Sequence, residues 1–169
     1  LGDRSNLQIT LPAYVEGEGW FGTNIARGQS RNVNLPTPNA YTQVDAPLSF
    51  VKAVTTTNSN PAGSPNHHLQ ISYNNGANIA VDTTFSGYKL CRFSFNVPAT
   101  NTTTNLQFSV IDDLGLAADN QNISHVEITY PRINNFSDQT YAELTVPFNP
   151  SQNGRMVQVT NFNVESLVA

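Results

Sequence analysis

Short runs in which apolar and polar residues alternate recur along this chain, and they constrain its fold more than any other feature. Alternation with a period of two places apolar side chains on one face of a strand and polar side chains on the other. Each run therefore predicts a half-buried β-strand. The clearest runs contain Phe93, Phe108, Ile128 and Leu144. Further strands are predicted at residues 7–11, 48–56, 69–73, 79–81 and 157–159.

The segments between these runs are rich in Pro, Gly, Asn and Ser, as at residues 58–66, 98–105 and 149–154. This is the spacing of many short strands joined by turns. The Asn75-Gly76 step predicts a hairpin turn, because both residues tolerate a positive φ. Residues 112–120 could hold a helical turn, but Gly115 argues against a longer helix.

Roughly eight to ten predicted strands favour two packed sheets over one open sheet. The predicted fold class is all-β, an antiparallel β-sandwich of jelly-roll-like architecture. A length of 169 residues suits one hydrophobic core, so residues 1–169 are expected to form a single domain. The alternation leaves the order of the strands open.

The composition is polar but carries little charge, and this excludes several classes of partner. Charged residues make up 12% of the chain, the net charge is −4, and Asn is more frequent than Asp, Glu, Lys and Arg together. The few Lys and Arg residues are scattered, which argues against binding to nucleic acid or anionic lipid. No run reaches the ~20 apolar residues of a membrane helix. Such compositions are typical of extracellular β-sandwiches.

The N-terminal segment has no basic-then-apolar signal pattern. We therefore expect either that an export signal has been removed or that the chain is a piece of a larger exported protein.

Three segments carry a family resemblance. Residues 17–22 read GEGWFG, residues 126–132 read VEITYPR, and residues 159–164 read VTNFNV. In this order and spacing they resemble the β-sandwich that precedes the caspase-like protease domain of gingipain-family cysteine peptidases. The similarity is greatest to the type IX secretion sortase of Bacteroidetes, and it spans residues 17–164.

The resemblance implies a non-catalytic accessory domain that supports or docks to a protease domain absent from this chain. The catalytic Cys-His dyad of the parent would lie in that later domain, so no catalytic residue is carried over. The family also implies secretion, residence at the cell surface or outer membrane, and a parent that trims C-terminal signals from exported proteins. The alternatives are a carbohydrate-binding module, favoured by the low charge and the lone Trp, and a cell-surface adhesin domain.

Trp20 and Phe21 are the first candidate site residues. On an extended backbone their rings point to opposite faces, so at most one of them faces the core. One ring could close the end of the sandwich, with the flanking glycines allowing a tight turn. Alternatively, an exposed ring could stack on a sugar or contact a neighbouring domain.

Asp112, Asp113, Asp119 and Asn120 form the densest oxygen-rich cluster and are a candidate calcium site. Their spacing matches no EF-hand loop, and backbone carbonyls would have to complete the ligand shell. The other interpretation is an ordinary solvated loop. Under both interpretations, calcium is possible and no cofactor is required.

The remaining chemical candidates favour structural roles. Cys91 shares a strand face with Phe93, which predicts a core thiol rather than a nucleophile. Adjacent His67 and His68 would point to opposite faces of a strand and could not easily ligate one zinc ion. His125 faces outward beside Val126, with no acid partner evident in the sequence. We therefore predict that this chain has no catalytic residues.

Overall fold

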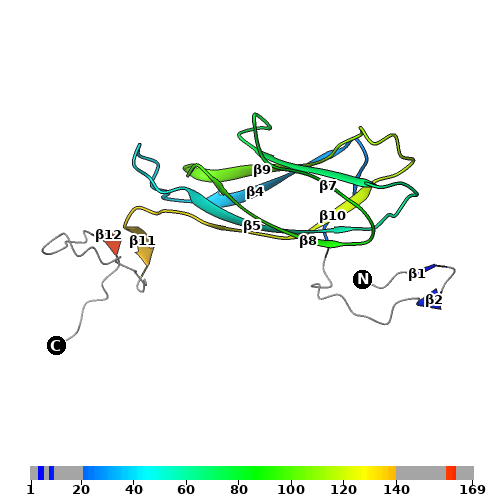
Figure 1. Ribbon diagram of the computed structural model, residues 1–169. Coiled ribbons are helices and arrows are strands. Elements are labelled where there is room, and N and C mark those ends of the chain that lie inside the picture. Colours follow the sequence, from blue (N-terminus) through cyan, green and yellow to red (C-terminus); the bar gives the residue numbers. More distant parts are fainter. Residues whose placement is uncertain (1–3, 6–7, 10–20, 140–158, 163–169) are drawn as a thin grey trace, which may run out of the picture.

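The computed structural model describes residues 4–5, 8–9, 21–139 and 159–162. Two four-stranded antiparallel sheets pack face to face, with β4, β7 and β9 in one layer and β5, β8 and β10 in the other (Figure 1). The all-β antiparallel sandwich predicted from the alternation is confirmed. The β5 sheet has the order β3 (Ile25–Ala26), β10 (Asn120–Thr129), β5 (Ser49–Thr57), β8 (Leu90–Val97). The β9 sheet has the order β4 (Ser30–Thr37), β9 (Thr102–Val110), β6 (His67–Tyr73), β7 (Asn78–Phe85).

The strands pair as a set of nested hairpins. β6 pairs with β7, β5 with β8, β4 with β9 and β3 with β10, and all of these pairs are antiparallel. Successive pairs fall alternately in the two sheets. This is the jelly-roll arrangement, in which a long folded hairpin wraps into a sandwich. It supplies the strand order that the alternation left open.

The turn between β6 and β7 lies at the tip of this nested set. Asn74, Asn75 and Gly76 all have positive φ, at 55°, 55° and 85°. The Ala77 amide donates to the Asn74 carbonyl at 3.2 Å and closes the turn. A side chain at Gly76 would also lie 3.1 Å from Gln107 Oε1. The hairpin predicted from the Asn-Gly step is confirmed, and glycine fits both its backbone and its neighbour.

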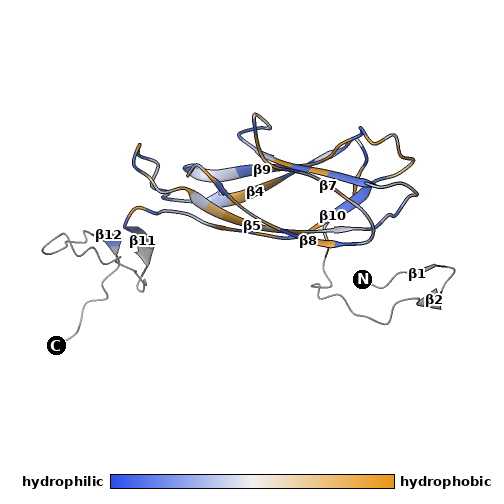
Figure 2. Cartoon of the chain, in the orientation of Figure 1, coloured by the Kyte–Doolittle hydropathy of each residue, from blue (hydrophilic) through white to orange (hydrophobic). Residues whose placement is uncertain are grey.

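One apolar layer fills the space between the sheets. Figure 2 shows stretches of hydrophobic colour along β5 and β8. Phe93 and Phe95 of β8 are half-buried against this layer, on the strand face predicted for them. The buried members come from both sheets and comprise Ile25, Val51, Ala53, Leu69, Ile71, Val97, Leu106, Phe108, Val110 and Ile123.

Strand β4 was not predicted from the sequence. It contributes Val33 and Leu35 to the core, but these are its only two apolar residues apart from Pro36, and a proline argues against a strand. Pro36 is tolerated because β4 lies at the edge of its sheet and pairs with β9 on one side. The sequence signal was therefore weak at a strand that the fold requires.

The strands predicted near the two ends of the chain are only partly covered by the described residues. β2 (Gln8–Ile9) lies within the predicted strand at residues 7–11 and pairs with β1 (Arg4–Ser5). The predicted strand at residues 142–148, and residues 157–158, lie outside the described residues. Val159 is followed by β12 (Thr160–Phe162), which pairs in parallel with β11 (Asn135–Gln139).

The connection between β9 and β10, residues 111–119, is irregular. Gly115 has a φ of 66° there, in keeping with the argument against a longer helix. No helix in the described part of the chain has the length and hydropathy needed to span a bilayer.

The position of Phe108 predicts a large effect of truncation on stability. Its side chain is fully buried, so Phe108→Ala should lower the free energy of unfolding by about 3–5 kcal/mol through lost burial and a cavity. Phe50→Ala is the matched control, because Phe50 faces outward and is 39% exposed. Urea denaturation followed by fluorescence measures both values. Equal losses in the two variants would contradict the placement of the core.

Candidate functional site

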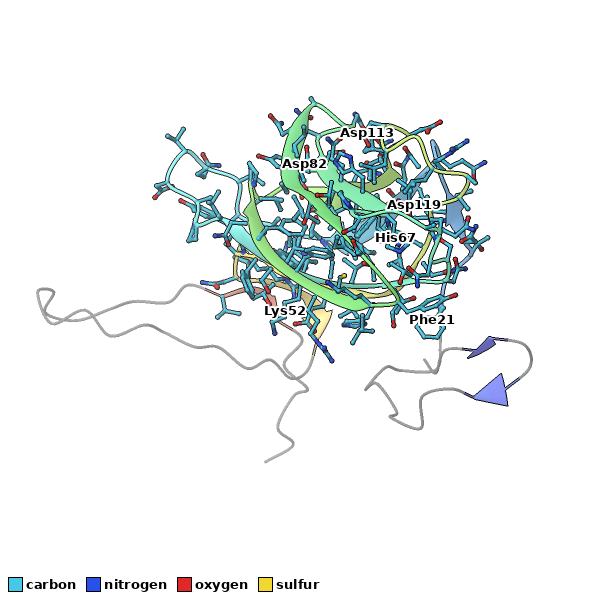
Figure 3. The ribbon with its side chains drawn as sticks, turned by 45° about the vertical axis from the view of Figure 1, so that its right-hand side comes forward. Phe21, Lys52, His67, Asp82, Asp113 and Asp119 are labelled. Atoms are coloured by element: carbon cyan, nitrogen blue, oxygen red, sulfur yellow. The ribbon has the colours of Figure 1, made fainter. Side chains whose placement is uncertain are left out.

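Of the two predicted aromatic contact residues, Trp20 lies outside the described residues. Phe21 is 37% exposed. The backbone that follows it is held on β10, because the Gly22 amide donates to the Ile123 carbonyl at 2.8 Å and Asn122 Nδ2 donates to the Gly22 carbonyl at 2.8 Å. Figure 3 shows Phe21 on the side of the sandwich away from Asp82 and Asp113.

The four residues of the predicted calcium cluster have separate partners. Asp112 lies 3.3 Å from Arg27 Nε, and Asp113 contacts His68. Asn120 accepts from Asn24 Nδ2 at 3.1 Å. Asp119 is buried and contacts His67. In the described ranges, no three His, Cys, Asp or Glu residues are grouped so that they could hold a metal ion. Calcium binding by these four residues stays a prediction.

Asp119 is the centre of a buried hydrogen-bond network. Its Oδ1 lies 2.7 Å from His67 Nδ1, and its Oδ2 accepts from the His68 amide at 2.9 Å. Gln121 Nε2 also donates to the carboxylate. Figure 3 shows His67 and Asp119 together inside the sandwich. Because a buried carboxylate is costly unless it is hydrogen-bonded, these donors fix the end of the β9–β10 connection against β6.

His67 is fully buried, and its ring stacks on Phe85 with 5.2 Å between centroids. A histidine paired with an aspartate resembles part of a catalytic triad, but Nε2 of this ring is enclosed and has no hydrogen-bond partner in the described structure. A substrate cannot reach it in this arrangement. The pair is therefore a structural clamp between β6 and the segment that precedes β10.

His68 points away from His67, as the strand alternation predicted, and bridges two aspartates. Its Nε2 lies 2.6 Å from Asp82 Oδ1, and its Nδ1 lies 2.9 Å from both oxygens of Asp113. Burial of the ring lowers its pKa, but the hydrogen bonds and charges of the two carboxylates outweigh this and raise the pKa above its ordinary value. The hydrogen bonds from His68 and Gln70 lower the pKa of Asp82. Both ring nitrogens face carboxylates, so the bridge favours the imidazolium form.

His125 lies on the outer face of the β5 sheet, as predicted. It does have an acid partner, because Glu127 Oε2 lies 3.5 Å from its Nε2. The other oxygen of the same carboxylate, Oε1, forms an ion pair with Lys52 Nζ at 2.9 Å. Residues two apart on a strand share a face, so the spacing of His125 and Glu127 was a signal that the sequence interpretation missed.

Cys91 is half-buried on the inner face of β8, in the row that ends at Val97. Burial raises the pKa of its thiol, and the nearby Lys89 charge opposes this only in part. The thiol is therefore mostly protonated at neutral pH, the form that is a poor nucleophile.

A cleft of about 390 Å³ opens where β6 and β8 end and β9 begins. Tyr73, Val97 and Pro98 supply apolar surface. The rest of the lining consists of uncharged amide and hydroxyl side chains from Asn74, Asn75, Asn78, Thr100, Thr103, Thr104 and Asn105. The sequence predicted turns at residues 74–76 and 98–105. The second prediction is wrong from Thr102 onward, because β9 begins there and pairs with β4. The sequence did not indicate that the two segments meet, because the first joins β6 to β7 within one sheet and the second joins β8 of one sheet to β9 of the other.

No protein-family model and no curated protein matches the chain. Among solved structures, it is similar to dimeric latent PorU from Porphyromonas gingivalis, with a TM-score of 0.52 and 13% identity. That match covers 69% of this chain and 11% of the PorU chain, so the chain spans about a tenth of the length of PorU.

Two further solved structures are similar with lower TM-scores. The CBM36-1 domain of a multidomain xylanase, from the hindgut metagenome of Trinervitermes trinervoides, has a TM-score of 0.41 and 14% identity, over 67% of this chain and 87% of that one. The C-terminal domain of EclA, a sugar-binding protein, has a TM-score of 0.36 and 11% identity, over 76% and 99%. At 13% identity the PorU match supports the β-sandwich fold alone and assigns no family. The two matches with TM-scores below 0.5 carry no argument about this chain.

The His68 bridge predicts a dependence of stability on pH. Because the folded pKa of His68 is raised, its contribution is fully present below its unfolded pKa of about 6.5 and is lost as pH rises through the folded pKa. The contribution of Asp82, with a lowered pKa, is present above its unfolded pKa of about 3.9 and is lost as pH falls through the folded value.

The wild-type chain should therefore lose part of its free energy of unfolding as the pH rises above ~6.5, and His68→Gln should show a smaller loss over the same range. The difference should be on the order of 1 kcal/mol, because the two carboxylates are half-exposed and solvent screens them. Urea titrations between pH 5 and pH 9 (about the range of histidine titration) measure it. His125→Gln removes an exposed histidine and is the control. A wild-type profile unchanged by His68→Gln would contradict the bridge.

The environment of Cys91 predicts a slow thiol. Reaction with Ellman's reagent at neutral pH should be at least about tenfold slower in the folded chain than in the chain unfolded in urea, because burial disfavours the thiolate. Absorbance at the thionitrobenzoate band measures both rates. Equal rates would show that the folded thiol is accessible and ionised.

Proposed function

We propose that this chain is a non-catalytic accessory β-sandwich domain of a secreted gingipain-type cysteine peptidase or type IX secretion sortase. The observation that carries the proposal is the similarity of its fold to a segment of PorU, at a TM-score of 0.52 over 69% of the chain. The three short segments that resemble the same family support it. In this role the chain docks to a protease domain, which carries the catalytic residues, outside the cell or at the outer membrane.

The chemistry of the described residues is compatible with an accessory role. The three histidines contact carboxylates, His67 in the interior and His68 and His125 in surface ion pairs. Cys91 has a raised pKa and lies on a strand face directed at the core. These are structural arrangements rather than those of an activated nucleophile.

The surface that we assign to the protease domain is the start of β5. Leu48 is 58% exposed, and Phe50, two residues further on, is 39% exposed on the outer face of the β5 sheet. Exposed apolar side chains that share a face are typical of contacts between domains. The same strand carries the ion pair of Lys52 with Glu127, which would form a polar rim beside them.

The first experiment is to read the coding frame that contains this chain on both sides. The proposal expects a caspase-like domain with a Cys-His pair. An unrelated enzyme, or a complete frame with no protease domain, would contradict it.

A binding measurement then tests the docking surface. The chain should bind the separately expressed protease domain. The double variant Leu48→Asp/Phe50→Asp should raise the Kd at least about tenfold, because it places charge in an apolar contact. Ile79→Asp is the matched control, because Ile79 is similarly exposed but belongs to β7 of the other sheet. Isothermal titration calorimetry measures the three Kd values. An equal rise in Kd for Ile79→Asp would contradict the assignment of the contact to the start of β5.

A further inference from the structure

The cleft beside the β6–β7 turn has a lining without ionised side chains at neutral pH. Besides the Tyr73 hydroxyl, its polar side-chain groups are four asparagine amides and three threonine hydroxyls. Each amide offers two donors and one acceptor, and each hydroxyl is both a donor and an acceptor. A charged ligand would find no counter-charge in this lining, whereas a neutral ligand rich in hydroxyl groups could form many hydrogen bonds.

Several of these polar groups are available to a ligand. The side chains of Asn74, Asn75 and Asn78 are exposed and form no hydrogen bond within the part of the chain that the structure describes. Tyr73, half-buried at the end of β6, provides an aromatic surface beside Val97 and Pro98. A sugar presents hydroxyls at its edge and C–H groups on its face, so it matches a site with amides around an aromatic ring.

The two walls of the cleft are held in place before any ligand binds. One wall is the β6–β7 turn, which its positive φ angles and the Ala77–Asn74 hydrogen bond fix. The other wall is the β8–β9 connection. There the buried Thr37 donates to the Thr100 carbonyl at 2.7 Å, and the Thr100 hydroxyl lies 2.6 Å from that of Thr104. A site that is already ordered loses less entropy when it binds.

From this lining we propose that the cleft is a binding site for a neutral saccharide. A volume of about 390 Å³ lies in the usual range of small-ligand sites and suits a short stretch of glycan. Asn75 and Asn78 hydrogen-bond the sugar hydroxyls, and Tyr73 contacts the ring face. This proposal depends only on the residues of the cleft and is independent of the proposed protease partner.

A peptide strand is a less suitable occupant. A strand added to a sheet needs a row of backbone donors and acceptors along an edge strand. This cleft lies across the ends of β6 and β8 and the beginnings of β7 and β9, and its lining comes from these strand ends and their connections rather than from the length of one edge strand. The chemistry of the lining therefore favours the saccharide.

Affinity gel electrophoresis of the whole chain tests the site, with xylan, β-glucan, mannan, dextran and the anionic polygalacturonate in separate gels. We expect at least one of these neutral polysaccharides to retard the chain. Asn75→Gly/Asn78→Ala should weaken that retardation at least about tenfold, because two amides that contact the sugar are lost. Glycine suits the φ of 55° at position 75, and both positions are exposed, so the variant should retain its fold. Circular dichroism and thermal unfolding check this.

Gln29→Ala is the matched control, because it removes an exposed amide whose backbone pairs with Val110, at the opposite end of β9 from the cleft. It should leave retardation unchanged. Trp20→Ala distinguishes binding in the cleft from stacking of a sugar on the Trp20 ring, the alternative that the sequence left open. The proposal is overturned if no neutral polysaccharide retards the chain, if only anionic polygalacturonate does so, or if retardation depends on Trp20 and not on the two cleft amides.

Discussion

The nested pairing of strands around the β6–β7 turn is the constraint on which the rest of the structure depends. Each strand must pair within its own sheet while its apolar face is buried against the other sheet, and the two conditions are met together when the pairs alternate between the layers. Phe108 of β9 and Val51 of β5 then occupy one apolar layer. Burial of that layer, roughly proportional to the apolar area removed from water, holds the sheets together.

Two histidines attach the β9–β10 connection to this framework, one in the interior and one nearer the surface. The His67–Asp119 pair is enclosed by protein and fixes the connection between β9 and β10, while His68 ties that connection to β7 through Asp113 and Asp82. His67 and His68 of β6 thus join the β9–β10 connection to β6 and β7. The surfaces proposed for binding carry different chemistry, apolar at the start of β5 and uncharged amide and hydroxyl in the cleft.

Much of the candidate site was beyond sequence reasoning, for a physical reason. The run from Asp112 to Asn120 was recognised as oxygen-rich, but Asp113 meets a histidine 45 positions away and Asp119 one 52 positions away. The Asn75-Gly76 turn was predicted from its backbone preference, yet its meeting with Thr100 and Thr104 was not. Local preferences describe one turn at a time, and a cleft formed by two turns requires the strand order. The nearer pair, His125 and Glu127, was within reach because strand alternation alone places both on one face.

The sequence by itself determined the all-β class, most of the central strands, the hairpin at Asn75-Gly76 and the core-facing row from Cys91 to Val97. These follow from a period of two and from the tolerance of Asn and Gly for positive φ, which act over a few residues. Only the tertiary structure decided the strand order, the use of the weakly patterned β4, the partners of each aspartate and the existence of the cleft. Alternation tells a side chain which face to occupy but not which strand lies beside it or across the layer, and that choice is made by the packing of all strands at once.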